Sequence, residues 1–245
     1  MKFSILAAAG TVSRWSVPAT LLMSLASATF AMPAPEVLLS SQASSDFPLA
    51  ADADSSTWRD APRVIADHDP FGKSLHDART EIRSRWTRNN LYFLFVAHYR
   101  ELYLQSKASL DGETLGLWNH DVAEVFIGYD FVNIGAYKEF EVSPRGEFID
   151  LDVDLKRSGN EFDWHWDSGF HVRARVDPAA RVWVCEMQIP WTAISIRPPA
   201  AGAEFRLNLY RIEGAPPRRK FIVWQVTHSS SFHTPDAFGR LRLIE

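Results

Sequence analysis

Residues 80–99 read TEIRSRWTRNNLYFLFVAHY, and this stretch decides the fold class. From Thr80 to Trp86 every second residue is uncharged, and the residues between them are charged. Such alternation is typical of a strand that buries one face. Arg88-Asn89-Asn90 predicts a turn, and the apolar and aromatic run 91–99 predicts a strand near the centre of a sheet. The stretch therefore predicts a β-hairpin.

The same pattern predicts strands along the rest of the chain. Their ranges are 122–129, 138–143, 147–154, 170–176, 182–189, 205–212, 221–226 and 241–244. Only two short stretches look helical, residues 191–194 and 235–238. Many short strands without a long amphipathic helix predict an all-β fold, an antiparallel β-sandwich with one or two short helical turns.

Composition excludes several classes of protein. The chain has 245 residues, of which 46% are hydrophobic and 23% charged, so it is too apolar to be disordered. Its single cysteine, Cys185, cannot form an internal disulfide, and strand alternation places it in the core. There is no Cys/His cluster for zinc. The formal net charge of -4 argues against nucleic acid as a partner.

The first residues have the pattern of a targeting segment. Lys2 and Arg14 precede an apolar run, and small residues follow it, which predicts a signal peptide over residues 1–31 with cleavage after Ala28 or Ala31. A membrane anchor is the alternative, but the run is short. Residues 32–56 are rich in Ala, Ser, Pro and Asp and predict a flexible leader. The folded domain is then 57–245, secreted or periplasmic and free of the membrane.

Carboxylates gather on the predicted strands. If Pro144-Arg145 forms a two-residue loop, Glu139 lies across from Asp150, and one sheet face collects five acids. These are Glu124, Glu139, Glu141, Asp150 and Asp152. Like charges facing each other destabilise a sheet, so the cluster needs a compensating group. A solvated acidic face, a site for sugar hydroxyls and a calcium site all remain open.

Trp118 is the tryptophan for which the sequence predicts a surface role. The chain has nine tryptophans, of which Trp58, Trp86, Trp183 and Trp191 are expected in the core. Trp118 stands in a polar loop, LWNHD at 117–121, that leads into the strand of Glu124. An indole ring can stack on the apolar face of a sugar while carboxylates accept its hydroxyls. Asp121 could orient this loop through backbone N–H groups.

Seven motifs occur in the order found in a known family. They are WRDA (58–61), LYFLF (91–95), LWNHDVAEVFI (117–127), YKEFEVSP (137–144), EMQIPW (186–191), RLNLYR (206–211) and FHTPDAFG (232–239). With them the chain resembles the carbohydrate-binding module family 9-like proteins of the DOMON-like superfamily. The resemblance implies a DOMON-like, immunoglobulin-like jelly-roll sandwich that binds sugars on one sheet.

The resemblance also implies site residues. Trp118 and Glu124 match the stacking tryptophan and the hydroxyl-binding acid, and Glu139 and Glu141 match two polar sugar-contacting positions. This chain has two acids where well-studied members have Arg and Asn. Arg211 is expected either to neutralise the acidic face or to line the site. His233 is expected near the site or pinning the C-terminal turn.

The function expected from these residues is sugar binding without catalysis. The partner would be an oligo- or polysaccharide within carbohydrate breakdown, with glycoside hydrolases as possible companions. No cofactor is expected apart from calcium. A haem-binding electron-transfer domain is one alternative, and it would need axial His, Met or Lys ligands. A glycoside hydrolase, or an accessory domain of one, is the other, because two carboxylates can act as acid and base.

Overall fold

The computed structural model describes residues 36–107, 109–157, 161–195 and 197–245. The expected signal peptide, its cleavage site and the first residues of the expected leader lie outside this part of the chain. Within the described residues, no helix is long and apolar enough to cross a membrane.

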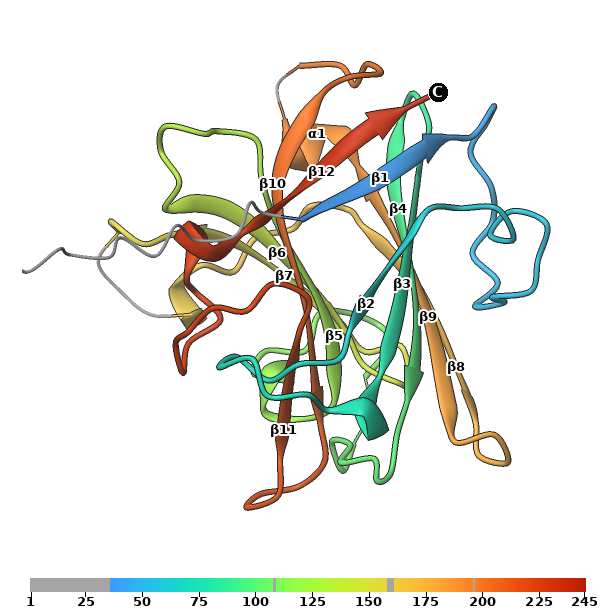
Figure 1. The fold of residues 1–245 in the computed structure, drawn as a ribbon, viewed down its shortest axis with the longest axis vertical. Helices are drawn as coiled ribbons and strands as arrows, with labels where there is room; N and C mark the ends of the chain where they lie inside the picture. Colours follow the sequence, from blue (N-terminus) through green and yellow to red (C-terminus); the bar gives the residue numbers. More distant parts are fainter. Residues whose placement is uncertain (1–35, 108, 158–160, 196) are drawn as a thin grey trace, which may run out of the picture. The chain divides into compact units, whose positions relative to one another are not determined.

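Twelve strands make up the described part of the fold (Figure 1). They are β1 (Val37–Gln42), β2 (Arg63–Ala66), β3 (Thr80–Trp86), β4 (Asn90–His98), β5 (Val122–Gly128), β6 (Ala136–Val142), β7 (Phe148–Asp154), β8 (His171–Asp177), β9 (Val182–Pro190), β10 (Glu204–Glu213), β11 (Lys220–Val223) and β12 (Gly239–Ile244). The helical pieces are α1 (Trp191–Ile194) and the 3-10 turns η1 (His76–Ala78), η2 (Leu117–Asn119), η3 (Glu161–Asp163) and η4 (Pro235–Ala237). The hairpin predicted from residues 80–99 is confirmed as β3 and β4.

Hydrogen bonds join the strands in the order β7-β6-β5-β10-β12-β1-β3-β4-β9-β8, with β11 on β10 and β2 on β3. Side chains from the strands at both ends of this order line the principal core. Phe93 of β4 and Met187 of β9 share it with Val125 of β5 and Leu209 of β10. The two halves therefore face each other across one apolar layer, and the predicted all-β sandwich is confirmed.

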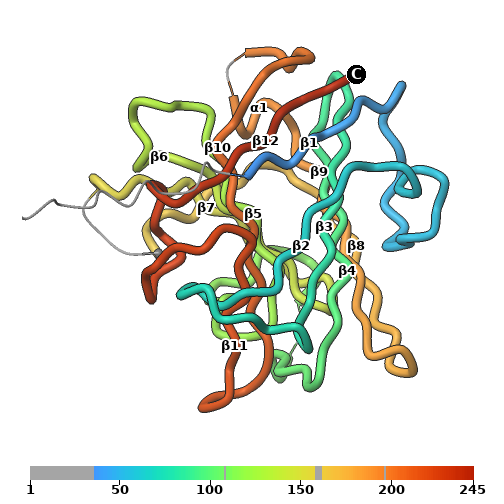
Figure 2. Tube along the Cα trace, viewed as in Figure 1, coloured from blue at the N-terminus to red at the C-terminus, as the bar shows by residue number. Residues whose placement is uncertain are grey.

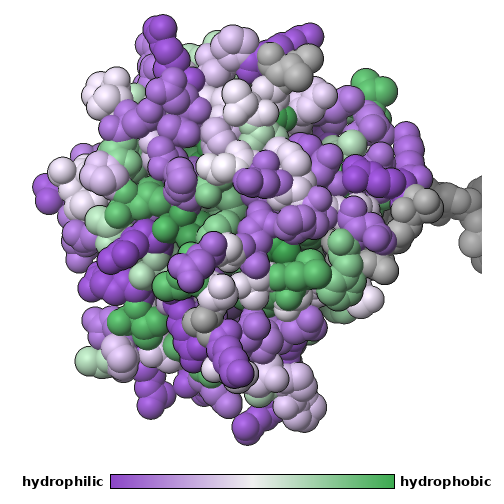
Figure 3. Space-filling view, turned by 180° about the vertical axis from the view of Figure 1, so that it is seen from behind, coloured by the Kyte–Doolittle hydropathy of each residue, from purple (hydrophilic) through white to green (hydrophobic). Residues whose placement is uncertain are grey.

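Each half of the sandwich also carries apolar side chains on its outer face. On the β5-β6-β7-β10 half, Phe126, Leu151 and Tyr210 belong to a second cluster. On the β4-β9 half, Trp58 packs with Tyr92 in a third. A strand that is covered on both faces has a nearly continuous run of apolar residues. This explains why β4 and β5 do not show the alternation of charged and uncharged residues that β3 shows. Figure 3 shows one molecular face, where apolar groups lie in separate patches among hydrophilic ones.

The expected flexible leader is wrong for residues 36–56, because β1 lies within them. β1 pairs in parallel with both β12 and β3 and so joins the two halves of the sheet (Figures 1 and 2). Leu38 is buried in the principal core, and Phe47 stacks on Tyr92 with ring centroids 4.0 Å apart. The polar composition concealed a short alternation, since Leu38 and Ser40 point inward and their neighbours outward.

The predicted register of β6 and β7 is wrong by one residue. Ser143 pairs with Glu147, not Gly146, because Gly146 takes a left-handed conformation (φ 91°) and lengthens the turn. Phe140 therefore lies opposite Asp150, and Glu139 lies opposite Leu151. A slip of one residue moves every side chain of a strand to the other face. Asp150 and Asp152 consequently lie on the face opposite Glu139 and Glu141.

Candidate functional site

A pocket of about 340 Å³ opens on the outer face of β5, β6 and β10. Side chains from these strands form its floor, and the loops before β5 and β12 form its walls. The lining residues are Trp118, Asn119, Glu124, Phe126, Glu139, Ile212, Arg219, Phe221, Ser230, Ser231, Phe232 and His233. Four residues expected at a sugar site, Trp118, Glu124, Glu139 and His233, are thus brought together.

Trp118 stands on the 3-10 turn η2 at the edge of the pocket. Gly116 begins the turn with φ 81°, a conformation that glycine adopts without strain, and the His120 amide closes it on the Leu117 carbonyl at 2.9 Å. The Trp118 side chain is half-buried, and its ring centroid lies 5.4 Å from that of Phe162. An indole held in this way keeps part of its ring available to a ligand.

Arg219 fastens this turn from the segment between β10 and β11. Its Nη2 donates to the Trp118 carbonyl at 2.5 Å and to the His120 carbonyl at 2.9 Å. Burial lowers the pKa of Arg219, and the negative charges of Asp121 and Glu124 oppose that shift. Sequence periodicity does not predict the role of Arg219, because the residue lies in the loop between β10 and β11 and contacts a segment about a hundred positions away.

Three carboxylates lie on the floor side of the sheet. Glu124 of β5 faces Glu141 of β6 directly, and Glu139 follows two residues earlier on the same face of β6. All three are buried, with exposures of 1% for Glu124, 0% for Glu141 and 4% for Glu139. Glu124 and Glu139 line the pocket, and Glu141 lies beside them.

His233 closes the pocket from the segment before β12. Its Nδ1 lies 2.7 Å from the Tyr137 hydroxyl and 4.0 Å from Oε2 of Glu139. The Trp164 ring packs edge-on against it at 5.3 Å. His233 is therefore part of the pocket wall.

Tyr210 and Phe232 form an aromatic pair behind the wall. Their rings stack with centroids 4.1 Å apart, and the Tyr210 hydroxyl donates to the Phe232 carbonyl at 3.0 Å. Burial raises the pKa of Tyr210, and the negative charges of Glu124 and Glu139 raise it further. The hydroxyl therefore stays a proton donor and fixes the backbone of the loop that bears Phe232.

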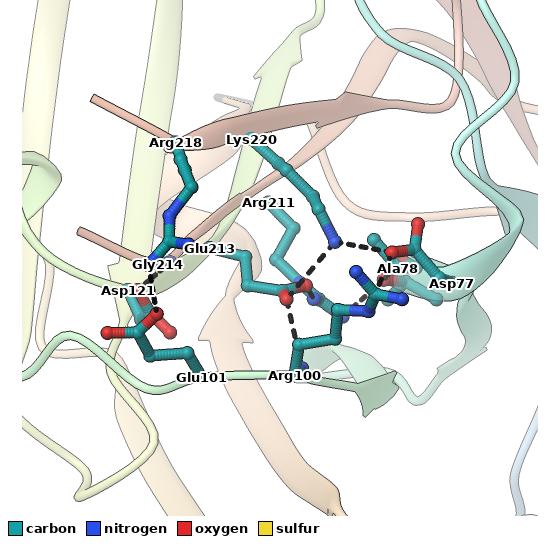
Figure 4. Close-up of polar contacts among 11 residues, drawn as sticks. Asp77, Ala78, Arg100, Glu101, Asp121, Arg211, Glu213, Gly214, Arg218 and Lys220 are labelled. Atoms are coloured by element: carbon teal, nitrogen blue, oxygen red, sulfur yellow. Dashed lines mark hydrogen bonds and ion pairs between the residues drawn. The ribbon is translucent and has the colours of Figure 1, made fainter. Parts of the chain in front are cut away.

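Arg211 was expected either to line the site or to neutralise the acidic face, and the structure places it at neither position. It alternates with Leu209 along β10 and so points to the opposite face, where it is 1% exposed. There its Nη2 pairs with Glu213 (Figure 4). Its Nη1 donates to the Thr80 hydroxyl at 3.0 Å. Strand alternation in β10 predicts this orientation, since Arg211 lies an even number of residues from two leucines that are buried in the principal core.

Asp121 supports the site from behind rather than through the Trp118 turn. Its Oδ1 accepts from the Gly214 amide at 2.6 Å, which ties the start of β5 to the end of β10 (Figure 4). Burial raises the pKa of Asp121 to about 7.

A group of carboxylates that could hold a metal lies away from the pocket. Ligand oxygens of Glu113, Asp150 and Asp167 are all within 4.8 Å of one another. Burial and the charge of Asp150 raise the pKa of Glu113 to about 7, and His165 pairs with Glu113. Oxygen ligands of this kind suit a hard cation such as calcium. Asp150 belongs to this group because of the shifted register.

The fold and the pocket define a β-sandwich module with a ligand-sized recess on the outer face of one half. A family model described as carbohydrate family 9 binding domain-like matches residues 51–245, and the chain belongs to this family. No curated protein sequence matches the chain.

Solved structures of similar fold agree with this membership. A family 9 carbohydrate-binding module from Caldicellulosiruptor kristjanssonii in complex with cellotriose has 14% identity and a TM-score of 0.62, over 85% of this chain and 94% of that one. A family 9 module from the same organism in complex with glucose has 13% identity and a TM-score of 0.61, over 85% and 95%. A Bacteroides uniformis protein has 15% identity and a TM-score of 0.65, over 86% and 100%. At these identities the likeness concerns the fold.

Proposed function

We propose that this protein binds carbohydrate in the Trp118 pocket and has no catalytic activity of its own. The observation that carries the proposal is the half-buried Trp118 ring at the edge of a pocket with Glu124 and Glu139 on its floor. Membership of a family described as carbohydrate-binding supports it, as do the saccharides bound to two family 9 modules of similar fold.

The chemistry of the pocket suits a pyranose ring. The apolar face of the ring packs on the indole of Trp118, where burial of C–H groups supplies affinity. Hydroxyls at the ring edge donate to the carboxylates of Glu124 and Glu139. A hydrogen bond to a charged group contributes about 1.5–3 kcal/mol, and a site with such acceptors rejects ligands that lack the donors.

The biological setting is also part of the proposal. The signal-peptide pattern of residues 1–31 supports a secreted or periplasmic protein. A binding module in that location would hold oligo- or polysaccharide during breakdown, in company with glycoside hydrolases that cut it.

Glycan-array screening followed by calorimetry tests the proposal. Wild-type protein is expected to bind at least one class of glycan, and Trp118→Ala is expected to lose tenfold or more in affinity. Trp166→Ala is the matched control, because Trp166 is also partly buried but packs against the principal core. Absence of glycan binding by the wild type, or equal losses of affinity in both variants, would contradict the assignment of the binding site to the Trp118 pocket.

A further inference from the structure

We propose that Glu113, Asp150 and Asp167 bind one calcium ion, which fastens two loops to β7. None of the three residues lines the Trp118 pocket, and the proposal does not depend on sugar binding. It rests on the spacing of three carboxylates from separate segments, and on a buried carboxylate oxygen that accepts no hydrogen bond from the described residues.

The three acids come from distant parts of the chain. Asp150 lies in β7, Glu113 in the loop between β4 and β5, and Asp167 in the segment between η3 and β8. One ligand oxygen from each residue lies within 4.8 Å of the other two. The fold therefore brings three negative groups to one point, where an ion can contact all of them.

The spacing of these oxygens fits calcium. Calcium binds oxygen ligands at about 2.3–2.6 Å, so two ligands on opposite sides of one ion lie about 5 Å apart. The separations of up to 4.8 Å fall within this limit. Each carboxylate can bind calcium through one or both oxygens, so three carboxylates supply a large share of the roughly six to eight ligands that calcium takes, and water completes the set.

Asp150 provides the second, independent observation, because one of its oxygens is buried without a donor. The residue is 1% exposed. Its Oδ2 accepts hydrogen bonds from the Ser168 amide at 3.1 Å and the Ser168 hydroxyl at 2.5 Å. Its Oδ1 is buried and accepts none from the described residues. Such an acceptor commonly marks the place of a bound water or ion, and the two acids beside it favour a cation.

His165 compensates this group only in part. Its Nε2 contacts Oε2 of Glu113. An imidazole carries at most one positive charge, and this contact involves one of the three carboxylates. The His165 side chain is 53% exposed, against 14% for Glu113, so it can turn toward solvent when an ion enters. A calcium ion brings two charges and contacts all three acids directly.

Backbone hydrogen bonds hold the site in place from outside. The Thr114 amide donates to the Phe148 carbonyl at 2.8 Å, which ties the loop of Glu113 to β7. Oδ1 of Asp167 accepts from the Gly169 amide at 3.0 Å. Asp167 is exposed whereas Asp150 is buried, so the group has one side open to solvent. An ion can therefore enter from that side without unfolding of the chain.

The donor set also selects among metals. Zinc is bound mainly by cysteine sulfur and histidine nitrogen, and this group consists of carboxylates. Magnesium requires near-ideal octahedral geometry at about 2.0–2.1 Å and keeps several of its waters. Calcium accepts irregular sets of oxygen ligands, so we expect calcium to bind more tightly than magnesium.

Calorimetric titration of chelator-treated protein with calcium chloride at pH 7.5 tests the proposal. We expect one ion per chain with a dissociation constant of about 0.1 mM, as in extracellular modules, and magnesium binding at least tenfold weaker. Calcium at about 10 mM, roughly 100 times that constant, is expected to raise the midpoint of thermal unfolding by roughly 5–10 °C.

Variants assign the ion to this group. Asp150→Asn and Asp167→Asn are each expected to weaken calcium binding tenfold or more. Asp167 is exposed, so its variant tests the site even if Asp150→Asn does not fold, which circular dichroism reports. Asp152→Asn is the matched control, because it removes the same charge two residues along β7, where Asp152 pairs with Lys138.

Four outcomes would overturn the proposal. The first is no calcium binding by the wild type below about 1 mM, which would mean that a proton or water alone lies among the acids. The second is magnesium binding as tight as calcium binding. The third is unchanged calcium affinity in Asp167→Asn, and the fourth is an equal loss in Asp152→Asn. Calcium binding without any glycan binding would contradict the proposed function and leave this proposal standing.

Discussion

Glu124 of β5 lies directly opposite Glu141 of β6, and both side chains are buried. Acidic side chains directly opposite each other oppose sheet formation where both are charged. The surrounding fold tolerates the pair because the strands are held by apolar contacts on both faces, with Val125 and Phe140 in the principal core. Glu124 lines the pocket, and Glu124 and Glu141 together favour the protonated form of Arg219 against its burial, which lowers its pKa.

Replacement of Arg219 by alanine should loosen the Trp118 turn. The change removes two hydrogen bonds to the Trp118 and His120 carbonyls, so we expect faster amide hydrogen exchange at His120. Under the proposed function, sugar affinity should also fall about tenfold, which calorimetry would measure. Arg218→Ala is the control, because Arg218 is its exposed neighbour. Equal exchange rates in both variants would show that Arg219 does not hold the turn.

Removal of the charge on Glu213 should strongly destabilise the protein. Arg211 is buried, and Glu213 is its ion-pair partner. Loss of one member of a buried pair leaves the other charge uncompensated and costs about 3–5 kcal/mol. We expect urea unfolding of Glu213→Gln to show a loss of this size, against almost none for Glu101→Gln, whose pair with Arg218 is exposed. A loss below 1 kcal/mol in Glu213→Gln contradicts this account.

Asp121 should make the protein less stable as the pH rises from about 4 to 7. Burial raises its pKa from 3.8 to about 7 in the folded state, so the folded protein binds the proton more tightly than the unfolded chain. The stabilisation from protonation is complete below pH 3.8 and lost above pH 7, with an upper size of about 4 kcal/mol. Glu113, whose pKa is raised in the same direction, adds to the trend.

The contribution of Asp121 can be isolated with Asp121→Asn, which keeps an oxygen acceptor for the Gly214 amide. Urea unfolding of wild type and variant between pH 5 and 8 should show a smaller decline with pH for the variant. Identical declines would mean that Asp121 does not carry the pH dependence.

Truncation of Leu38 should show that β1 is part of the domain. Leu38 is 1% exposed in the principal core, so Leu38→Ala is expected to cost about 2–5 kcal/mol through lost burial and a cavity. Leu39 points outward from the same strand, and Leu39→Ala should change stability by less than about 0.5 kcal/mol. Equal, small effects on thermal unfolding would support a flexible leader instead.

Local pattern was sufficient for most of the strands. The alternation from Thr80 to Trp86 and the apolar run that follows predicted β3 and β4, and the same reading found β5 to β12. It missed β1 and the four-residue β2, because short strands with polar residues carry little periodicity. The position of Trp118 in a loop before β5 was also evident, since polar residues surround it in the chain.

The sequence by itself thus determined the all-β class, most strand positions, and the presence of Trp118 and Glu124 at neighbouring points of the chain. Only the tertiary structure decided which charges meet. Gly146 lengthens one turn by a residue and moves Asp150 and Asp152 off the face of Glu139. Arg219 reaches the Trp118 turn across about a hundred residues. Alternation fixes which residues share a face of their own strand, whereas pairing between strands and contacts across loops depend on the packed chain as a whole.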